Sequence, residues 1–503
     1  MKANGLSNVL ILCLGVCFAP YISAAEISPD NTNIQYHGRW NFDAPAAPWV
    51  VWQGSSIVVR FDGTKITGAF DVSTRKKQYR VVVDGVPNAE RLYMVPGPGT
   101  YTLAENLVPG VHTVELFQET FTSNKTTFRG LEIDGKLLPP PARPELRIEF
   151  FGDSNMDGTS LYSEKNTGDS GTYYAYPAMV TRMLGAEMHL EALGGATLAD
   201  RGDNNVRDFI FSENFRDQDA RYRSGFKPHI IVVNAGANDI NGADENTIRQ
   251  RYKDVVSDLR GVYGPDPHIV LMNAYGWDVK EPANYSPDVV KEIGDPNVTA
   301  FLYAWLWEKW HGSQWEHSGE AQMLMDHLAS VNPEWKRVNP VEIVDGFGRN
   351  GDFANGSFEY QAPFGAYGWR YMEDGVERIK DSAKAAHGDY FIRLDAGEFV
   401  HQPTDATGDL LPGATDGTET YTITASIRGT APGAQAQVIT EFQGQQIWTR
   451  ANAVTATFDV TTDWEEYSTT VKSVAGTWTL FNTLKASKGT VEFDDVRMGL
   501  VGN

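Results

Sequence analysis

The apolar pattern of the chain changes twice, and these changes constrain the fold more than any other feature. Between about Leu146 and Asn332, short apolar runs alternate with a segment of helical periodicity. The runs at 146–151, 230–234 and 269–273 indicate buried strands. The helical spacing between the last two runs is carried by Ile248, Tyr252, Val255, Val256 and Leu259. This alternation predicts a three-layer α/β domain with a mostly parallel sheet.

Both flanks of this region have the pattern of β-sheet proteins. From about residue 34 to residue 138, short runs rich in β-branched and aromatic residues are separated by turn pairs such as Asp62-Gly63 and Pro109-Gly110. Regular turns between short strands are typical of a β-sandwich. The same pattern returns from about residue 350 to the end. We therefore expect a multidomain chain with a signal peptide at 1–25, a β-sandwich at 26–142, the α/β domain at 143–345 and a second β-sandwich at 346–503.

The first 25 residues have the composition of a signal peptide. An apolar run at 9–19 is too short for a membrane span and is followed by the small residues Ser23 and Ala25. Cleavage near Ala25 predicts a secreted or periplasmic protein. A lipid anchor on Cys17 is disfavoured, because Val16 stands where a small residue is expected.

Composition excludes several classes of protein. The formal net charge is -22, with 43 basic against 65 acidic residues, which argues against binding of nucleic acid. Both cysteines, Cys13 and Cys17, lie in the signal peptide, so the mature chain has no disulfide, cysteine nucleophile or thiolate metal site. No later stretch is long and apolar enough to predict a membrane span.

Three predicted strand ends carry residues suited to acyl transfer. Gly152-Asp153-Ser154 follows the first strand, Gly194-Gly195 follows the run at 188–193, and Asn238 follows the strand at 230–234. Each motif alone is also a common turn, but the carboxyl ends of parallel strands meet at one edge of a sheet. We expect Ser154 to be the nucleophile, with an oxyanion hole made by the N–H groups of Ser154 and Gly195 and the amide of Asn238.

In their order, these blocks resemble the SGNH, or GDSL, hydrolase superfamily, which adds a late histidine. Tyr36-His37-Gly38-Arg39-Trp40 and Trp52-Gln53-Gly54-Ser55 narrow the resemblance to carbohydrate esterase family 2, in which a jelly-roll sandwich precedes the SGNH domain. The resemblance implies a serine esterase that removes acetyl groups from a polysaccharide or oligosaccharide and needs no cofactor. Gly194 and Thr197 depart from the family's Ser-Gly-x-Gly block, which leaves the shape of that loop open.

The catalytic base has several candidates, because the family's late Asp-x-x-His motif is missing. We choose His317, which precedes a predicted helix, as the family's base does. Gln314, three residues earlier, supplies no negative charge, so the resemblance implies a Ser-His dyad. The adjacent Glu316 helps only if the backbone turns unusually. His311 is the alternative base.

His327 is assigned to the surface or the cap of that helix, the usual position of a lone histidine. Two further functions stay open beside the esterase. The missing aspartate is compatible with a carbohydrate-binding protein that has lost catalysis, and the superfamily also includes lipid esterases and thioesterases.

The C-terminal segment resembles jelly-roll carbohydrate-binding modules. This resemblance implies a structural calcium near the paired chain ends with Asp495 as an oxygen ligand, although a turn aspartate fits the same position. Trp369, Tyr371 and Trp448 are candidate sugar-stacking residues. The sequence gives no prediction of the oligomeric state.

Overall fold

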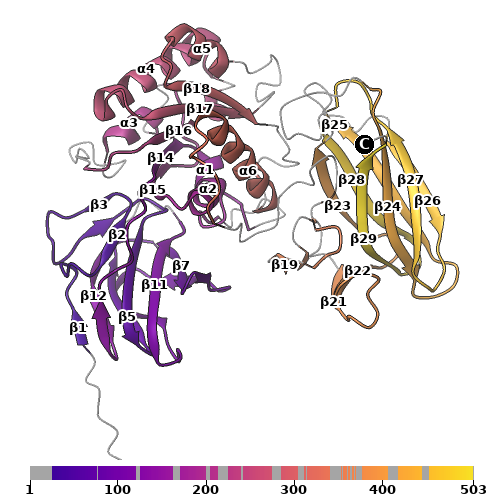
Figure 1. The fold of residues 1–503 in the computed structure, drawn as a ribbon, viewed down its shortest axis with the longest axis horizontal. Helices are drawn as coiled ribbons and strands as arrows, with labels where there is room; N and C mark the ends of the chain where they lie inside the picture. Colours follow the sequence, from indigo (N-terminus) through magenta and orange to yellow (C-terminus); the bar gives the residue numbers. More distant parts are fainter. Residues whose placement is uncertain are drawn as a thin grey trace, which may run out of the picture.

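The computed structural model contains two β-rich bodies and an α/β body between them in sequence (Figure 1). The residues that the structure describes are 25–75, 77–120, 125–162, 170–199, 204–212, 225–239, 242–274, 285–303, 311–312, 314–339, 353, 355–359, 361–362, 365–366, 369, 376–405, 417–443, 453–477 and 479–501.

The N-terminal body consists of two antiparallel sheets. Its strands are β1 (Ala25–Ile27), β2 (Gln35–His37), β3 (Trp40–Asn41), β4 (Trp49–Val50), β5 (Ser56–Gly63), β6 (Ile66–Val72), β7 (Lys77–Val83), β8 (Val86–Pro87), β9 (Leu92–Met94), β10 (Gly97–Ala104), β11 (Gly110–Gln118), β12 (Thr126–Ile133) and β13 (Lys136–Leu138). One sheet has the order β10-β6-β12-β4-β3, with β1 on β12, and the other has the order β13-β5-β11-β7-β8, with β2 on β5 and β9 on β7. Burial alternates along β6, because one face of each sheet packs into a shared apolar core.

The α/β body contains a five-stranded parallel sheet. Its elements are β14 (Arg147–Gly152), α1 (Ser154–Asp157), α2 (Tyr176–Leu184), β15 (Glu187–Ala192), α3 (Val206–Phe211), β16 (Ile230–Asn234), the 3₁₀ turn η1 (Ala237–Asp239), α4 (Glu245–Tyr263), β17 (His268–Ala274), α5 (Tyr285–Ile293), β18 (Val298–Tyr303) and α6 (Gln314–Val331). The strand order is β15-β14-β16-β17-β18. The chain therefore reverses its direction of winding between β14 and β16, and such switch points place functional residues at the carboxyl ends of the strands.

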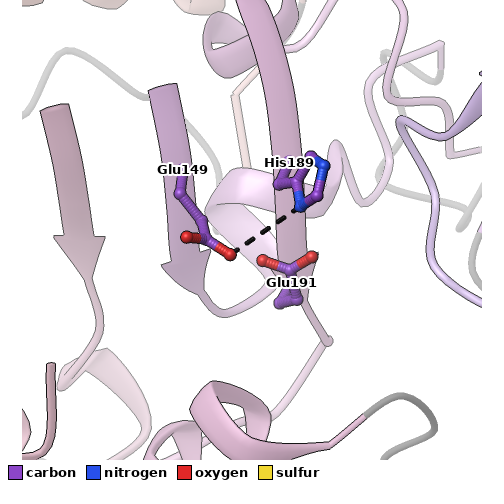
Figure 2. A group of neighbouring side chains, drawn as sticks. All are labelled: Glu149, His189 and Glu191. Atoms are coloured by element: carbon purple, nitrogen blue, oxygen red, sulfur yellow. Dashed lines mark ion pairs between the residues drawn. The ribbon is translucent and has the colours of Figure 1, made fainter. Parts of the chain in front are cut away.

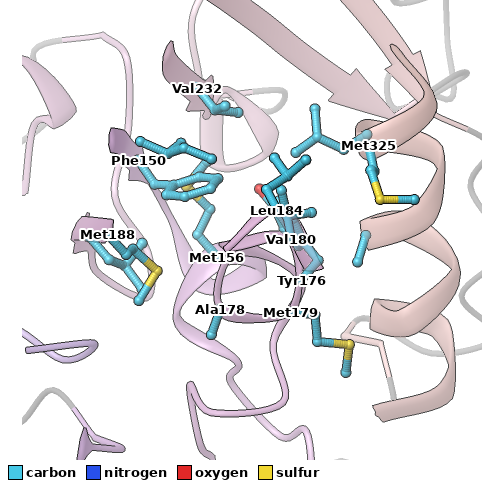
Figure 3. Close-up of a cluster of buried hydrophobic side chains, with 14 of the residues drawn as sticks. Phe150, Met156, Tyr176, Ala178, Met179, Val180, Leu184, Met188, Val232 and Met325 are labelled. Atoms are coloured by element: carbon cyan, nitrogen blue, oxygen red, sulfur yellow. The ribbon is translucent and has the colours of Figure 1, made fainter. Parts of the chain in front are cut away.

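The strands of this sheet are buried on both faces, as expected for a parallel sheet between helices. Phe150 and Val232 pack with α2 and α6 in one cluster, where Figure 3 shows Tyr176 and Met325. Phe151 and Val233 face the opposite way, toward α3, α4 and α5. The N-terminal body adds Val82 and Phe117 to the first cluster and Trp52 to the second, so the two bodies share apolar cores.

The C-terminal body consists of two antiparallel sheets around a third core. Their orders are β21-β22-β29-β24-β27 and β23-β28-β25-β26. The strands are β21 (Glu377–Lys380), β22 (Tyr390–Leu394), β23 (Phe399–Asp405), β24 (Thr420–Gly429), β25 (Gln435–Gln443), β26 (Val454–Asp459), β27 (Glu465–Lys472), β28 (Thr479–Lys488) and β29 (Val491–Leu500), and the short pair β19 (Gln361–Ala362) and β20 (Gly365–Ala366) precedes them.

The expectation of a multidomain chain with β-rich regions on both sides of a central α/β domain is confirmed. One local prediction is wrong: α6 begins at Gln314, so His317 lies inside the first turn of the helix and does not precede it. Over the described ranges, no helix combines the length and the apolar character needed to cross a membrane.

Candidate active site

The ends of three neighbouring strands lie level with one another at the switch point of the sheet. Gly152, the last residue of β14, pairs in register with Ala192 of β15 and with Asn234 of β16. The segments that carry Ser154, Gly195 and Asn238 therefore start from the same edge of the sheet, as the sequence predicts.

Ser154 begins the short helix α1 directly after β14. The Oδ1 atom of Asp153 accepts the Asn155 N–H at 3.0 Å, which caps the turn. The Ser154 carbonyl accepts the N–H of Thr159 at 3.2 Å, and Ser154 keeps 8% of its surface exposed. The nucleophile candidate is thus held on a tight turn between strand and helix.

The loop after β15 reaches the same point. Gly195 has a φ of +81°, and a Cβ added there would meet no atom within 4 Å, so the backbone conformation, and not lack of space, favours glycine. A Cβ added to Gly194 would lie 3.8 Å from Ser154 Cβ and 3.5 Å from Asp157 Oδ2. The glycine pair therefore packs beside the turn that carries Ser154.

The turn after β16 ties these two segments together. Asn238 Nδ2 donates to the Ala196 carbonyl at 2.9 Å and to Asp153 Oδ2 at 3.4 Å. The fully buried Asp239 accepts the Leu198 N–H at 2.8 Å and the Ala199 N–H at 2.9 Å, each on a different oxygen. Asp239 is a site residue for which the sequence suggested no role, although it stands next to Asn238.

Two carboxyl groups beside Ser154 hold their protons unusually tightly. Burial raises the pKa of Asp153 to about 8, with the nearby Asp157 and Asp239 adding to the effect. Burial raises the pKa of Asp157 to about 7, although Thr159 and the Gly194 N–H donate hydrogen bonds to it. Burial beside Ser154 therefore disfavours negative charge on these two carboxyl groups.

His317 lies against the start of α2. Its ring is 1% exposed, its Nδ1 accepts the Tyr176 N–H at 3.3 Å, and it stacks on the Tyr176 ring at 5.9 Å between centroids. Burial, with a contribution from His311, lowers the pKa of His317 to about 3. The imidazole is neutral at pH 7, and because Nδ1 accepts, its proton is on Nε2.

The other two histidines differ in their surroundings. His311 is partly buried, and this burial lowers its pKa to about 4. His327 stacks on Phe301 at 4.9 Å, and its Nε2 lies 3.1 Å from Thr299 Oγ1. The expectation of a surface or capping role for His327 is therefore wrong, because the ring packs on β18. The side chain of Glu316 lies outside the described residues.

Among the residues that the structure describes, the two carboxylates at the expected calcium site of Asp495 do not form an oxygen shell. Asp495 forms an ion pair with Arg497 at 3.3 Å. The neighbouring Asp494 accepts the N–H groups of Ala386 and His387 at 2.8 Å and that of Asp495 at 2.7 Å. Calcium needs a shell of oxygen ligands, whereas these carboxylates already face hydrogen-bond donors and a guanidinium.

A second acidic cluster joins the N-terminal body to the sheet. Figure 2 shows Glu149 on β14 beside His189 and Glu191 on β15. The buried Arg39 guanidinium lies 2.9 Å from a carboxylate oxygen of Glu149 and 2.9 Å from one of Glu191. Arginine thus supplies the cation here, and the cluster is a buried ion-pair network between the two bodies.

The predicted sugar-stacking residues divide into two groups. Trp369 is 2% exposed and donates from Nε1 to the Asn355 carbonyl at 3.0 Å. It belongs to the C-terminal core, so the sugar-stacking prediction for Trp369 is wrong. Tyr371 and Trp448 lie outside the described residues.

The fold and the Ser154 turn define the class of the central domain: residues 150–317 match the GDSL-like Lipase/Acylhydrolase family. Residues 36–141 match the family described as Carbohydrate esterase 2 N-terminal. The two matches follow one another along the chain, the carbohydrate esterase 2 N-terminal match first and the GDSL-like match second.

Three proteins are similar to the chain, and the two solved structures among them, each below 25% identity, share its fold. The Cellulase/esterase CelE of Acetivibrio thermocellus is 29% identical over 253 residues, which are 48% of this chain and 31% of that protein. A family two carbohydrate esterase from Clostridium thermocellum in complex with cellohexaose is 24% identical, with a TM-score of 0.55 over 60% of this chain and 99% of that chain. An acetyl xylan esterase from the rumen bacterium Butyrivibrio proteoclasticus is 19% identical, with a TM-score of 0.56 over 62% of this chain and 99% of that chain. The chain thus spans about a third of the length of the curated relative.

Proposed function

We propose that this protein is a secreted serine esterase that removes O-acetyl groups from a polysaccharide or oligosaccharide through an acetyl-Ser154 intermediate. The observation that carries the proposal is the level register of β14, β15 and β16. This register brings Ser154, the Gly194-Gly195 loop and Asn238 together in a domain that matches a hydrolase family.

In this mechanism, the base takes the Ser154 proton while Oγ attacks the acetyl carbonyl. The N–H groups of Ser154 and Gly195 and the Asn238 amide stabilise the oxyanion. Asn238 does so by exchanging its 3.4 Å contact with Asp153 for the substrate oxygen. The protonated base then donates to the departing sugar oxygen, which leaves as a hydroxyl. In the second half, the base takes a proton from the water that attacks the acetyl-enzyme and returns it to Ser154 Oγ as acetate leaves.

His317 is the proposed base, with His311 as the alternative. In the structure, the Tyr176 N–H occupies Nδ1 of His317 at 3.3 Å, a long bond for this donor and acceptor. His317 therefore accepts the Ser154 proton only if this bond opens and the ring changes its tautomer or turns. His311 would need no such change at Tyr176. Rates for His317→Ala and His311→Ala separate the two assignments: the base variant loses turnover and the other keeps it.

The proposed substrate class rests on the relatives. One is named a cellulase/esterase, one an acetyl xylan esterase, and one was determined with cellohexaose.

Both β-rich bodies are proposed to be jelly rolls, with the domain boundaries 26–142, 143–345 and 346–503, and the last is proposed to bind carbohydrate. Signal-peptide cleavage near Ala25 is part of the same proposal.

Acetate release from a panel of acetylated polysaccharides tests the proposal. The wild-type protein is expected to release acetate from at least one of them, and Ser154→Ala is expected to release none above the uncatalysed rate. Equal rates for the two proteins would overturn the assignment of the nucleophile. A series of 4-nitrophenyl esters adds a second criterion, since a rate that rises with acyl length would favour a lipid esterase.

A second candidate function is carbohydrate binding without catalysis. The occupied Nδ1 of His317 favours it, as does Gln314 in the position where the family usually has an aspartate. Binding of oligosaccharides together with no hydrolysis of 4-nitrophenyl acetate would support this candidate.

A further inference from the structure

A single segment, residues 170–176, contacts His317 and also the turn that begins with Ser154. We call it the bridging segment. At its start, the Gly171 N–H donates to the Gly158 carbonyl at 3.1 Å, and Thr172 Oγ1 donates to the Asp157 carbonyl at 2.9 Å. These bonds attach the segment to the turn that begins with Ser154.

The other end of the bridging segment holds the proposed base. Tyr176 donates its N–H to His317 Nδ1 and stacks on the imidazole. The Tyr176 hydroxyl accepts from Asn234 Nδ2 at 2.9 Å, which anchors the ring to the end of β16. The Nδ1 bond opens in the proposed mechanism, but the stacking of the two rings does not depend on it. The position of the bridging segment therefore influences the separation of Ser154 and His317.

The N-terminal body supports the middle of the segment. Glu119, directly after β11, accepts the Thr172 N–H at 2.9 Å through its carbonyl and the Tyr173 N–H at 3.4 Å through Oε2. The Phe117 ring meets the Tyr173 ring edge-on at 5.2 Å. A residue of one body thus bonds two successive backbone N–H groups of the other.

Glu119 is in turn fixed by Arg80 of β7. Arg80 Nε donates to Glu119 Oε1 at 2.7 Å, and Tyr162 Oη lies within 3.3 Å of both Glu119 oxygens. Arg80 also donates to the Asn88 and Ala89 carbonyls at 2.6 and 2.8 Å. Both side chains of the ion pair are almost fully buried. Removing either side chain would therefore leave the other charge buried without its partner, which strongly destabilises a folded protein.

We propose that the buried Arg80–Glu119 pair of the N-terminal body is a positioning pair for catalysis, which holds the bridging segment and with it the distance between Ser154 and His317. The inference rests on the proposed function. In this proposal the N-terminal body contributes to turnover itself, in addition to its contribution to stability. Neither residue touches the reacting atoms.

The test is the Glu119→Gln variant, with Glu187→Gln as its matched control. Glu187 is also a buried carboxylate between the two bodies, 3.0 Å from His37 and 2.5 Å from Arg143. It begins β15, however, and so lies at the amino end of that strand, opposite the carboxyl ends that lead to Ser154. We expect Glu119→Gln to lower kcat on 4-nitrophenyl acetate roughly 10- to 100-fold with KM nearly unchanged, because a misplacement of about 1 Å reduces rates by this order. Glu187→Gln should keep the wild-type kcat at a comparable loss of thermal stability.

The milder Tyr162→Phe variant removes only a hydroxyl that lies within 3.3 Å of both Glu119 oxygens and accepts from Arg80 Nη2 at 3.2 Å. It should lower kcat by a smaller factor in a folded protein. Wild-type kcat in both Glu119→Gln and Tyr162→Phe, with Ser154→Ala inactive, overturns the inference and leaves the proposed function standing. An equal fall of kcat in Glu187→Gln also overturns it, because the effect would then follow interface stability. Activity in Ser154→Ala instead overturns the proposed function itself.

Discussion

Replacing Asp239 by asparagine should separate the loop after β15, which carries Gly195, from the turn after β16. Each carboxylate oxygen of Asp239 accepts one buried N–H, from Leu198 at 2.8 Å and from Ala199 at 2.9 Å. An asparagine keeps one acceptor and turns an NH₂ group toward the other N–H. Hydrogen bonds to charged groups contribute about 1.5–3 kcal/mol each, and an unsatisfied buried donor costs about 1–3 kcal/mol. We therefore expect a local destabilisation of about 2–4 kcal/mol.

The assay is kcat/KM on 4-nitrophenyl acetate together with thermal unfolding. Loss of one oxyanion donor typically lowers kcat by about 10²- to 10³-fold, and the displaced loop should produce a loss of this order. Asp244→Asn is the control: Asp244 Oδ1 caps α4 by accepting the Thr247 N–H at 2.9 Å, and asparagine caps equally well. Wild-type kcat/KM in Asp239→Asn would refute the reasoning that Asp239 holds the loop.

Three further predictions concern protonation and backbone strain. Burial lowers the pKa of Lys77 to about 7, below the unfolded value of about 10.4, so the unfolded chain binds more protons between these values and stability rises with pH across that window. Lys77→Met should therefore raise the melting temperature more at pH 6 than at pH 10. An equal rise at both pH values would contradict the lowered pKa of the Lys77 amine. Burial lowers the pKa values of His317 and His311 to about 3 and 4, so kcat/KM should stay level down to about pH 5. A fall of kcat/KM below a pH near 6.5 would instead show that the base is exposed to solvent. Gly195→Ala places a side chain at a φ of +81° and should lower stability by about 1–3 kcal/mol, which calorimetry would measure.

The arrangement of domains was predictable from sequence because it depends on periodicity. Runs such as 230–234 are buried on both faces in the structure, and burial on both faces makes a strand a continuous apolar run. The convergence of Ser154, Gly195 and Asn238 was predictable for a related reason, since parallel strands bring their carboxyl ends to one edge.

The surroundings of His317 were not predictable in this way. One partner of the ring is the backbone N–H of Tyr176, and any residue other than proline offers the same donor. The start of α6 at Gln314 was missed because the expected helix was read from apolar positions further along. Arg80 lies in a strand and Glu119 directly follows one, and in the sequence a buried, paired charge at such a position looks the same as one that faces solvent.

The most direct test of the central claim is mass spectrometry of the enzyme quenched during turnover of an acetylated carbohydrate. The account predicts an acetyl group on the peptide that contains Ser154, absent from Ser154→Ala and lost again when the substrate is exhausted. Acetate release with the acetyl group on a different residue, or undiminished turnover by Ser154→Ala, would contradict it.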